Sequence, residues 1–566
     1  MIEVKDAVLG YGKHTFIKAV DGANLVINPN EIVGIAGESG SGKSTLMRAI
    51  YGDFSTGLRM QSGSITASFE GHEPVASSEM RKLWWDTISY VPQGSMSVLN
   101  PLLKVHKQLV DGLPARKRGE GHARQKADLA RFLEGLGLDP SVLDAFPHQL
   151  SGGMRQRVLV AVASYVDPQL ILADEPTTAL DVVVQKRILM MLVEIQRRLK
   201  NTLVLVSHDL GVHYQMTDRL VIMYKGRIVE AGPTDEIFAN PQHEYTQRLI
   251  SSLPRIAQGS RLAASAAPRP AEVTPAPAPA DADGLPLLQM EGVSRFFHRG
   301  SGLFTRESFA AVDDVTFELP ATPCISSIVG ESGSGKSTLA RMLLRLVEPS
   351  KGSVRLLGRP VHGKKAERIP DLDFRRLVQP IFQNPFEAFS AYLPVVHYLR
   401  ATARNLDVAG DVDAVVDAAL RKVGLSLERI EGKFIRQFSG GELQRISVAR
   451  ALIPEPRLII ADEPVSMVDA SLRMSIVNIF KEIMEQNRVS FVYITHDLST
   501  AYYLSDRVSI MTRGRIIESG SPAEVLDNPG ESYTQELMAA VPEVGRRWPE
   551  IAALAGRAAD TAPATG

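Results

Sequence analysis

The chain of 566 residues contains only one cysteine, Cys324, and so forms neither an internal disulfide nor a cysteine-built metal or iron–sulfur site. It also lacks an apolar run of about 18 residues, the length that a membrane-spanning helix needs. Glu3, Lys5 and Asp6 stand where a signal peptide would need an apolar core. These absences predict a cytoplasmic protein that meets a membrane only by docking on other proteins.

An excess of either charge is missing too, because 63 Lys and Arg residues face 64 Asp and Glu residues. This balance gives no general attraction to nucleic acid or to anionic lipid. The hydrophobic content of 44% is that of an ordinary globular protein, and the length allows several domains.

What the sequence does contain is an internal duplication. The nine residues "GESGSGKST" occur at 37–45 and again at 330–338. Four further pairs follow in register, at offsets of 288 to 290: "YVPQ" with "PIFQ", "LSGGMRQR" with "FSGGELQR", "LILADEP" with "LIIADEP", and "LVSHDL" with "YITHDL". We therefore expect two domains of one fold, at 1–255 and 287–545. A Pro/Ala-rich, disordered linker is expected at 256–286, and a flexible tail at 546–566.

The pattern within each half predicts an α/β fold. Residues 31–37, "EIVGIAG", form a short apolar strand that enters the glycine-rich loop, and the residues after the loop continue as a helix. Apolar runs such as "LILAD" and "TLVLVSH" are typical of strands buried on both faces by helices. Residues 100–150 and 390–437 are helical in pattern, with an amphipathic example at 124–138.

The repeated loop has the pattern of a phosphate-binding loop, G-x-x-x-x-G-K-[ST]. Its glycines let backbone N–H groups converge on phosphate oxygens at a helix N-terminus, its lysine reaches the β- and γ-phosphates, and its serine ligates Mg²⁺. A chance Gly/Ser turn is the alternative, and an identical pair in the same context makes it negligible. The predicted nucleotide-binding residues are Gly37, Ser39, Gly40, Gly42, Lys43, Ser44 and Thr45, and Gly330, Ser332, Gly333, Gly335, Lys336, Ser337 and Thr338.

An acidic pair ends one apolar strand in each half. Asp174 and Asp462 are predicted to hold Mg²⁺, since a carboxylate can do so through the water shell of the ion. Glu175 and Glu463 follow directly and are predicted to orient or deprotonate the attacking water. A solvated acidic strand end is the structural alternative.

His208 and His496 follow another strand, each 34 residues after the aspartate of its half. This unchanged spacing favours a contact with the γ-phosphate over an ordinary structural histidine. Gln93 and Gln383 are weaker candidates alone, but their register with the other motifs supports a role at the same site, including at the metal.

The motifs "LSGGMRQR" and "FSGGELQR" add a Ser-Gly-Gly at the start of a helix, a second place where an anion can bind. With the other motifs, the chain resembles a pair of ATP-binding cassette (ABC) ATPase domains, and the resemblance covers all but the linker and the tail. It implies that each half has a RecA-like core, a β-subdomain and a helical subdomain. The residues of the two Ser-Gly-Gly motifs are Ser151, Gly152 and Gly153, and Ser439, Gly440 and Gly441.

In that family two cassettes close head to tail as a pseudo-dimer, and each ATP lies between the phosphate loop of one and the Ser-Gly-Gly of the other. The resemblance thus implies one site with Lys43, Gln93 and Glu175 facing Ser439. The other site would combine Lys336, Gln383 and Glu463 with Ser151. Because both halves keep the glutamate and the histidine, we expect both sites to hydrolyse ATP.

The family also places an aromatic ring against the adenine, upstream of each phosphate loop. Tyr11 fits this position in the first half, and Phe297 is the choice in the second, with Phe296 not excluded. A core aromatic is the alternative for each.

The "NP…YTQ-L…P" ending of each half resembles the ATPase subunits of bacterial dipeptide and oligopeptide importers, which also handle nickel and some oligosaccharides. This implies two membrane permeases and an extracytoplasmic solute-binding protein as partners, with the chain on the cytoplasmic face of the inner membrane. Residues 94–101 and 384–394 are the expected docking surface, with Phe386, Phe389 and Tyr392 as apolar anchors. Simple loop packing is the alternative.

The second half departs from the family pattern in "PVSMVDA" (464–470), where Met467 and Val468 replace the usual residues while Asp469 is kept. A twin-cassette protein acting on the ribosome or on DNA is the rival function. It would need a long charged helical linker, zinc-binding cysteines or coiled-coil insertions, and a fused exporter would need membrane spans. The sequence therefore favours the importer, with ATP and Mg²⁺ as its cofactors and no nucleic acid as partner.

Overall fold

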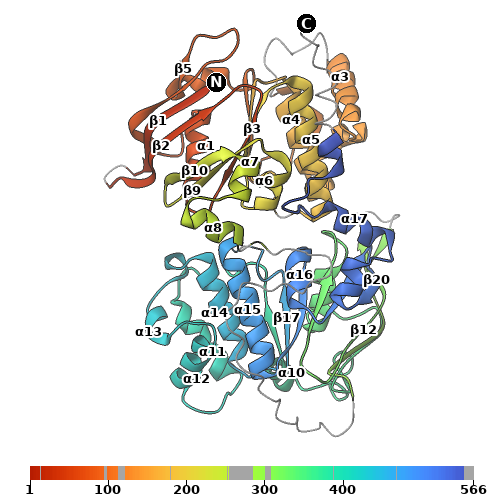
Figure 1. The fold of residues 1–566 in the computed structure, drawn as a ribbon. Helices are drawn as coiled ribbons and strands as arrows, with labels where there is room; N and C mark the ends of the chain where they lie inside the picture. The colour runs from red at the N-terminus through yellow and green to blue at the C-terminus, as the bar shows by residue number, and fades with distance from the viewer. Residues whose placement is uncertain are drawn as a thin grey trace. The chain divides into compact units, whose positions relative to one another are not determined.

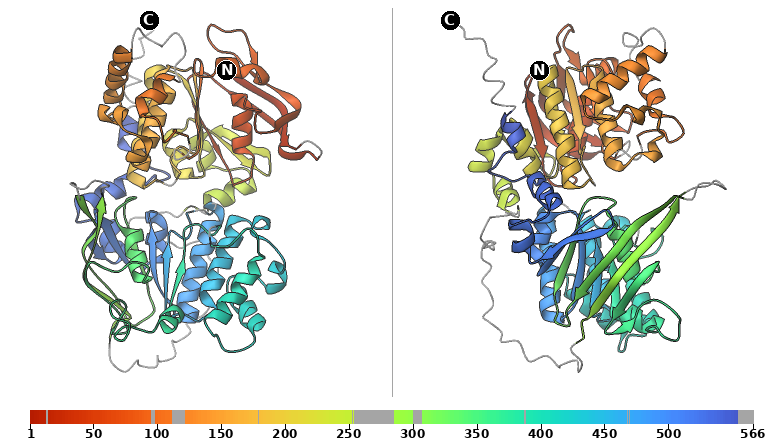
Figure 2. Two further views of the ribbon diagram at one scale, coloured as in Figure 1. Left: turned by 180° about the vertical axis from the view of Figure 1, so that it is seen from behind. Right: turned by 90° about the vertical axis from the view of Figure 1, so that its right-hand side faces the viewer.

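The computed structural model describes residues 1–553 except 13–14, 95–97, 112–121, 179, 252, 254–284, 300–306, 387, 467 and 469. Most of the expected linker, together with Met467 and Asp469, thus lies outside the described residues. The chain divides into two compact units, the first formed by Met1–Leu253 with Ala540–Gly566 and the second by Pro254–Ala539 (Figures 1 and 2). Within the described ranges, none of the helices combines the length and the apolar character that a membrane span requires.

Each unit contains a four-stranded antiparallel sheet. In the first unit the order is β2-β1-β4-β5, and in the second it is β12-β11-β14-β15. In β2 the side chains alternate near its end, with Ala23, Leu25 and Ile27 buried and their neighbours exposed, as expected for a sheet with one face on the core. The strands are β1 (Ile2–Tyr11), β2 (Ile17–Ile27), β4 (Leu58–Ala67) and β5 (Val75–Ala76), then β11 (Leu288–Arg299), β12 (Glu307–Leu319), β14 (Lys351–Leu356) and β15 (Arg359–Pro360).

Each unit also contains a six-stranded sheet that is parallel except for one edge strand. The orders are β10-β9-β3-β8-β7-β6 and β16-β17-β18-β13-β19-β20, so that β3 and β13 are central. Every residue of β3, β7, β8 and β13 is buried, which explains their near-continuous apolar sequences. In the more polar β13, Ser327 is accommodated by a hydrogen bond with the hydroxyl of Ser505.

The strands of these sheets have the following bounds. In the first unit they are β3 (Ile32–Ala36), β6 (Ile88–Val91), β7 (Leu170–Asp174), β8 (Thr202–Val206), β9 (Arg219–Tyr224) and β10 (Arg227–Pro233). In the second unit they are β13 (Ile325–Val329), β16 (Val378–Ile381), β17 (Leu458–Asp462), β18 (Ser490–Thr495), β19 (Arg507–Thr512) and β20 (Arg515–Gly520).

Helices cover the six-stranded sheets and form a further layer beside them (Figure 1). In the first unit they are α1 (Lys43–Tyr51), α2 (Val105–Asp111), α3 (His122–Gly135), α4 (Gly152–Tyr165), α5 (Val182–Leu199), α6 (Leu210–Met216), α7 (Thr234–Ala239) and α8 (Glu244–Ser251). In the second they are α9 (Lys336–Leu343), α10 (Asp371–Leu377), α11 (Val395–Asn405), α12 (Val412–Arg421), α13 (Leu427–Ile430), α14 (Gly440–Leu452), α15 (Ala470–Asn487), α16 (Leu498–Leu504) and α17 (Ser532–Ala540).

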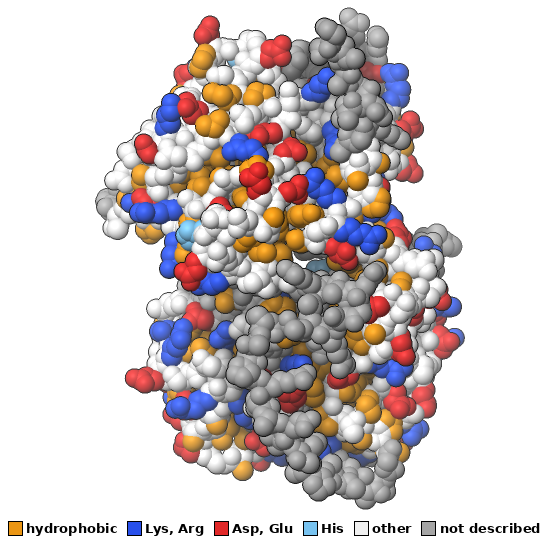
Figure 3. Space-filling view, in the orientation of Figure 1, with side chains coloured by type: hydrophobic (Ala, Val, Ile, Leu, Met, Phe, Trp, Pro, Cys, Tyr) orange, Lys and Arg blue, Asp and Glu red, His pale blue; other side chains and the backbone are white. Residues whose placement is uncertain are grey.

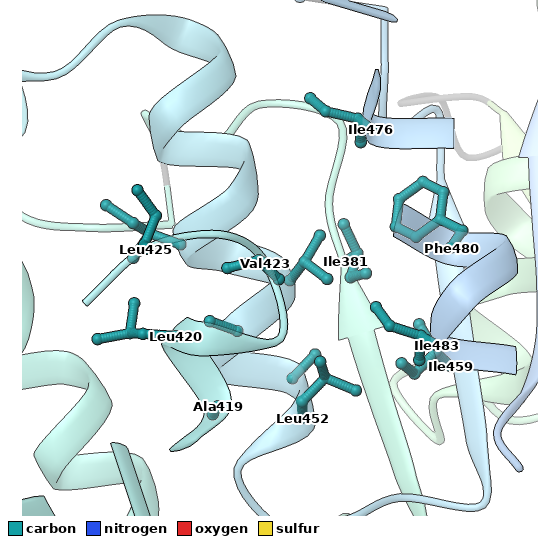
Figure 4. Packing of buried hydrophobic residues seen from close by; sticks show 14 of the residues in the cluster. Ile381, Ala419, Leu420, Val423, Leu425, Leu452, Ile459, Ile476, Phe480 and Ile483 are labelled. Carbon is teal, nitrogen blue, oxygen red and sulfur yellow. The ribbon is translucent and has the colours of Figure 1, made fainter. Parts of the chain in front are cut away.

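The largest core of the second unit lies where its helical layer meets the sheet. Side chains of α12, α14 and α15 converge there on β16 and β17, among them Leu420, Leu452, Phe480, Ile381 and Ile459 (Figure 4). The face seen in Figure 3 carries Lys/Arg and Asp/Glu side chains interspersed with one another. This agrees with the near-zero net charge of the chain.

The last described residues, 540–553, belong to the first unit. Trp548 and Ile551 are buried in the core that contains α4 and α5, and Trp548 is only 4% exposed. The amide of Gln215, on α6, donates to the carbonyl oxygens of Glu543 and Arg546 at 2.7 and 2.8 Å. The tail expected from residue 546 therefore differs from the structure, in which residues 546–553 are part of the folded unit.

Candidate nucleotide sites

Four polar motifs of the first unit lie at one edge of its six-stranded sheet. In the parallel strands Ile35 pairs with Val206, Asp174 with Val206, and Val91 with Ala173, so that β3, β8, β7 and β6 end at the same edge. The phosphate loop, His208, Glu175 and Gln93 follow these ends in that order. Parallel strands that end together are where α/β sheets bind ligands.

The second unit repeats this arrangement with the order β13, β18, β17 and β16. Val329 pairs with Thr495, Asp462 with Ile494, and Ile381 with Ala461. The sheet therefore brings together its own loop, His496, Glu463 and Gln383. The sequence motifs that recur in register thus also recur in space within each unit.

The phosphate loop of each unit is curled around its lysine. Nζ of Lys43 donates to the carbonyl oxygens of Gly37 and Glu38, both at 2.7 Å, and Nζ of Lys336 donates to those of Gly330 and Glu331 at 2.8 and 2.7 Å. Both lysine side chains are buried at the first turn of a helix, α1 or α9. This geometry leaves loop N–H groups to face an anion at a helix N-terminus.

Glycine is required where each loop enters its helix. Gly42 and Gly335 cap α1 and α9 with φ of 99° and 107°, in a backbone region that other residues rarely adopt. A side chain at either position would also collide with the carbonyl oxygen of Ala19 or Ala311.

An aspartate accepts a hydrogen bond from the loop serine in both units. Oγ of Ser44 lies 3.1 Å from Oδ1 of Asp174, and Oγ of Ser337 lies 3.4 Å from Oδ1 of Asp462. Burial raises the pKa of both carboxyl groups, although these hydrogen bonds oppose the effect. A cation placed there would favour the ionised form of both aspartates.

Glu175 sits in a strained backbone conformation and is held by three side chains. Its φ is 48°, a value that is uncommon outside glycine and that concentrates at functional sites. Gln93 and Thr178 donate to its Oε2 at 2.7 and 2.9 Å, and Nδ1 of His208 lies 3.7 Å from its Oε1. Burial would raise the pKa of Glu175, but His208, Thr178 and the charge of Lys43 together lower it to about 2.

Glu463 has the same strain, with a φ of 47°. Gln383 donates to its Oε2 at 2.9 Å, and Nδ1 of His496 lies 3.2 Å from its Oε1. Its pKa is also lowered, because the interaction with His496 and the charge of Lys336 outweigh the effect of burial. Both glutamates are therefore ionised at neutral pH, as an acceptor of a proton from water must be.

The two Ser-Gly-Gly motifs begin α4 and α14. Ser151 and Ser439 are the N-caps, and their hydroxyls accept hydrogen bonds from the N–H groups of Met154 and Glu442 at 3.2 Å. Gly152, Gly153, Gly440 and Gly441 form the first turns. In the second motif Glu442 also accepts from the backbone N–H of Ser439, which completes a capping box.

The expected adenine-contacting aromatics lie at or near the ends of corresponding strands, Tyr11 as the last residue of β1 and Phe297 two residues before the end of β11. Ile2 and Leu288 start matching ladders in β1 and β11, and counting along these strands places Phe297, not Phe296, at the position of Tyr11. The hydroxyl of Tyr11 lies 3.3 Å from that of Thr45 in the phosphate loop. The ring of Phe297 stacks on Phe309, an aromatic that the sequence did not single out.

Comparison with known proteins identifies the family. The family described as "ABC transporter" matches residues 20–178 and 312–466, which contain both phosphate loops and both acidic pairs. The chain belongs to the ABC transporter family. A second family, "Oligopeptide/dipeptide transporter, C-terminal region", matches residues 229–278 and 517–565. The two units are therefore ABC ATPase cassettes of the peptide-importer type, and such importer ATPases work with membrane permease subunits.

The relatives include the glutathione import ATP-binding protein GsiA of several bacteria. The protein from Salmonella paratyphi A is 35% identical over 93% of this chain and 87% of its own length. Those from Pectobacterium atrosepticum and Escherichia coli are 35% and 34% identical, over 93% and 94% of this chain and 86% and 88% of their own. Among solved structures, a cassette in a dimeric post-hydrolysis state bound to ADP and Pi covers 41% of this chain and 99% of its own, at 29% identity and a TM-score of 0.36. The chain is an ATPase subunit of an ABC importer.

The segments after Gln93 and Gln383 differ from the expected docking surface in one respect. Tyr392 is 89% exposed and Phe386 is also exposed, but Phe389 is buried in the core of the second cassette against Tyr398. Phe389 was therefore wrongly assigned as a surface anchor, because its place in a loop sequence does not show which way the ring points. Residues 95–97 and 387 lie outside the described residues.

Sequence reasoning missed several side chains that contact the predicted site residues. The hydroxyl of Tyr90 donates to Oδ2 of Asp174 at 3.0 Å, and Thr178 donates to Glu175. The position of Tyr90 is occupied by Pro380 in the second cassette, so that the recurrence that revealed the other residues gave no sign of it. Tyr245 and Tyr533 do recur, in the "YTQ" endings, and contact the phosphate loops.

Proposed function

We propose that the chain hydrolyses two ATP molecules, each bound by the phosphate loop of one cassette and the Ser-Gly-Gly of the other. The observation that carries this proposal is that both cassettes hold the same set of glutamine, glutamate, histidine and loop lysine in the same spatial arrangement. In each, a glutamine and a histidine flank an ionised glutamate, next to a phosphate loop that is curled around its lysine. A degenerate site would have lost one of these groups.

In this proposal the chain's own residues bind the triphosphate and prepare the water. Lys43 and Lys336 exchange loop carbonyl oxygens for β- and γ-phosphate oxygens, and the loop N–H groups surround the phosphates. Glu175 and Glu463, held in place by Gln93 and Gln383, orient the attacking water and accept its proton. His208 and His496 contact the γ-phosphate from the neighbouring strand.

The same residues suit Mg²⁺. Ser44, Asp174 and Gln93, and their counterparts Ser337, Asp462 and Gln383, offer only oxygen donors, which this ion prefers, and it keeps several waters and phosphate oxygens as further ligands. Among the described residues no group of three His, Cys, Asp or Glu side chains could form an all-protein metal site. When bound, Mg²⁺ would neutralise the developing charge on the phosphate oxygens.

Closure of the cassettes on ATP, and reopening after hydrolysis, would move the membrane partners. We place two permease subunits on the segments after Gln93 and Gln383, at the cytoplasmic face of the inner membrane, with an extracytoplasmic solute-binding protein delivering the solute. The exposed rings of Phe386 and Tyr392 would supply apolar area for such a contact.

The solute is proposed to be a short peptide or a peptide-like molecule such as glutathione. The relatives named as glutathione import proteins and the two oligopeptide/dipeptide transporter regions support this class. Recognition of the individual solute would belong to the binding protein and the permeases.

Reconstitution of the chain with its permeases and binding protein in vesicles tests the proposal. Labelled glutathione and a labelled dipeptide are compared for uptake, with ATP supplied on the side of the cassettes. We expect ATP-dependent uptake of at least one of them, and its loss when Glu175 and Glu463 are both replaced by Gln. Uptake that does not depend on ATP, or ATP hydrolysis with no uptake of any peptide-like solute, would contradict the assignment.

A further inference from the structure

A tyrosine from the C-terminal region of each cassette reaches the phosphate loop of the same cassette. The hydroxyl oxygen of Tyr245, in α8, accepts a hydrogen bond from the backbone N–H of Glu38 at 3.0 Å. The hydroxyl oxygen of Tyr533, in α17, accepts one from the N–H of Glu331 at 3.1 Å. The two tyrosines lie 207 and 202 residues from their partners, and yet both cassettes form the same contact.

The hydrogen bond is made at the peptide group that the loop lysine also holds. In the first cassette the carbonyl oxygens of Gly37 and Glu38, on either side of the Glu38 N–H, accept from Nζ of Lys43. The carbonyl of Glu38 also accepts from the N–H of Ser41 at 3.1 Å, which closes the first turn of the loop. The tyrosine therefore fixes the segment against which the phosphate-binding lysine is positioned.

The ring of Tyr245 is held firmly enough to fix a backbone group. It is 3% exposed and stacks on the ring of Tyr224 at 4.1 Å between centroids. Glu230, on β10, accepts hydrogen bonds from the N–H groups of Gln242 and His243 at 2.9 and 3.1 Å, just before α8 begins. The start of the helix, and with it the tyrosine, is thus fastened to the sheet of the cassette.

The second cassette fastens Tyr533 in a related way. Glu518, on β20, accepts from the N–H of Gly530 at 2.8 Å and from the hydroxyl of Thr534 at 2.5 Å. At the position of Tyr224 the second cassette has Thr512, whose hydroxyl donates to the carboxylate of Glu331 at 2.9 Å. The supporting side chains thus differ, while the hydrogen bond from the loop N–H to the tyrosine hydroxyl oxygen is kept.

We propose that Tyr245 and Tyr533 are positioning residues for nucleotide binding. Each hydroxyl holds the first peptide group of its phosphate loop in the curled shape that binds a triphosphate, and so links the C-terminal region of the importer to the ATP site. The inference rests on the proposed function of the loops. The tyrosine shapes the loop before ATP arrives. It therefore affects ATP binding and takes no part in proton transfer.

The test uses the full-length chain and the substitutions Tyr245→Phe and Tyr533→Phe, which remove the hydroxyl and keep the ring. To measure one phosphate loop at a time, Tyr245→Phe is combined with Lys336→Ala, and Tyr533→Phe is combined with Lys43→Ala. Binding of a fluorescent ATP analogue and the KM for ATP are measured. Loss of one hydrogen bond should weaken binding about five-fold and raise KM by a similar factor, with little change in kcat.

Tyr503→Phe is the matched control, because it also removes one hydrogen-bonded tyrosine hydroxyl, which here donates to Oδ1 of Asn478 in α15 at 2.8 Å. The control should bind ATP as the parent does, and all three variants should melt at similar temperatures without nucleotide. The inference is overturned if Tyr245→Phe and Tyr533→Phe bind ATP with parental affinity. It is also overturned if both variants melt at a lower temperature and this general loss of stability accounts for their weaker ATP binding. A parent chain that binds no ATP would instead refute the proposed function itself.

Discussion

The two cassettes of this chain share their reacting groups but not the side chains that support them. Glu175 is held by Thr178 in addition to Gln93, whereas the counterpart of Thr178, Ser466, donates to the backbone carbonyl of Glu463. Asp174 accepts from Tyr90, and Pro380 at the corresponding position cannot donate. The comparison shows that lysine, glutamate, histidine and glutamine form a fixed unit, while their surroundings vary.

A second difference lies far from the loops. Lys186 forms an ion pair with Glu550 at 2.8 Å, and Gln215 holds the chain around Trp548. The corresponding positions of the second cassette are Met474 and Tyr503, which cannot make these contacts. Residues 543–551 are therefore a structural element of the first cassette, attached to the helices that follow Asp181 and His208.

We expect the largest effect from replacing the glutamates, which tests whether both cassettes hydrolyse ATP. Glu175→Gln and Glu463→Gln remove the proton acceptor but keep the shape of the side chain, so that each should lower ATP hydrolysis by about 100-fold or more at its own site. ATP binding should remain, because the phosphate loop is unchanged. Single-turnover hydrolysis and nucleotide retention measure the two effects. If one variant hydrolyses ATP as the parent does, that cassette does not use its glutamate.

The attachment of the chain's end can be broken by Trp548→Ala. Truncation of a fully buried tryptophan costs about 3 to 5 kcal/mol, and we expect this loss in the unfolding of the first cassette only. Calorimetry of the full chain measures it. Trp85→Ala, at an exposed tryptophan of the same cassette, is the control and should change stability by less than about 0.5 kcal/mol. Equal effects of the two substitutions would mean that the segment adds no stability.

Acid should destabilise the first cassette more than the second. His213, in α6, is fully buried, and burial lowers its pKa from 6.5 to about 4 despite the hydrogen bond with the carbonyl of Ser207. Because the folded pKa lies below the unfolded one, the contribution of His213 to stability is complete above pH 6.5 and is lost as the pH falls towards 4. The full loss is about 3 kcal/mol. The second cassette has Ala501 at this position.

Thermal unfolding at pH 7 and pH 4.5 measures this difference. The parent should lose more stability in its first cassette than a His213→Gln variant does over the same pH range. An equal loss in the two proteins would show that His213 is not the acid-sensitive group.

The smallest effect is expected at Tyr90. Tyr90→Phe removes one donor from Asp174, which should shift the Mg²⁺ concentration for half-maximal hydrolysis at the first site by about five-fold. The measurement is a Mg²⁺ titration with the second site silenced by Glu463→Gln. When the first site is silenced instead, by Glu175→Gln, Tyr90→Phe should not change the Mg²⁺ dependence of the second site. A change in both backgrounds would mean that Tyr90 acts through the fold and not through Asp174.

The fold class, and the meeting of the main candidate site residues at one sheet edge, could be predicted because each of these polar motifs directly follows a buried apolar strand. Parallel strands end at one edge, and so Gln93, Glu175, His208 and the loop had to meet. The recurrence of these motifs in the second half distinguished them from chance matches. The choice of Phe297 over Phe296 came from the family resemblance, and the strand register places Phe297 at the position of Tyr11.

What the sequence could not predict are contacts made across long separations by residues without a recurring pattern. Tyr90 corresponds to Pro380, Ser466 at the position of Thr178 makes a different hydrogen bond, and the ring of Phe389 turns inward from a loop. Trp548 lies in a stretch with charged neighbours, which hid its packing on the first cassette. Tyr245 and Tyr533 recur, but nothing in their spacing shows that a hydroxyl reaches a loop more than 200 residues away.

The central claim is that each ATP is held by both cassettes. The most direct measurement is an experimental structure of the full chain carrying Glu175→Gln and Glu463→Gln, determined with Mg²⁺ and ATP. We predict two triphosphates, one in contact with Lys43 and Ser439 and the other with Lys336 and Ser151. Triphosphates that are contacted only by residues of the cassette whose lysine binds them, in the closed state, would contradict the account.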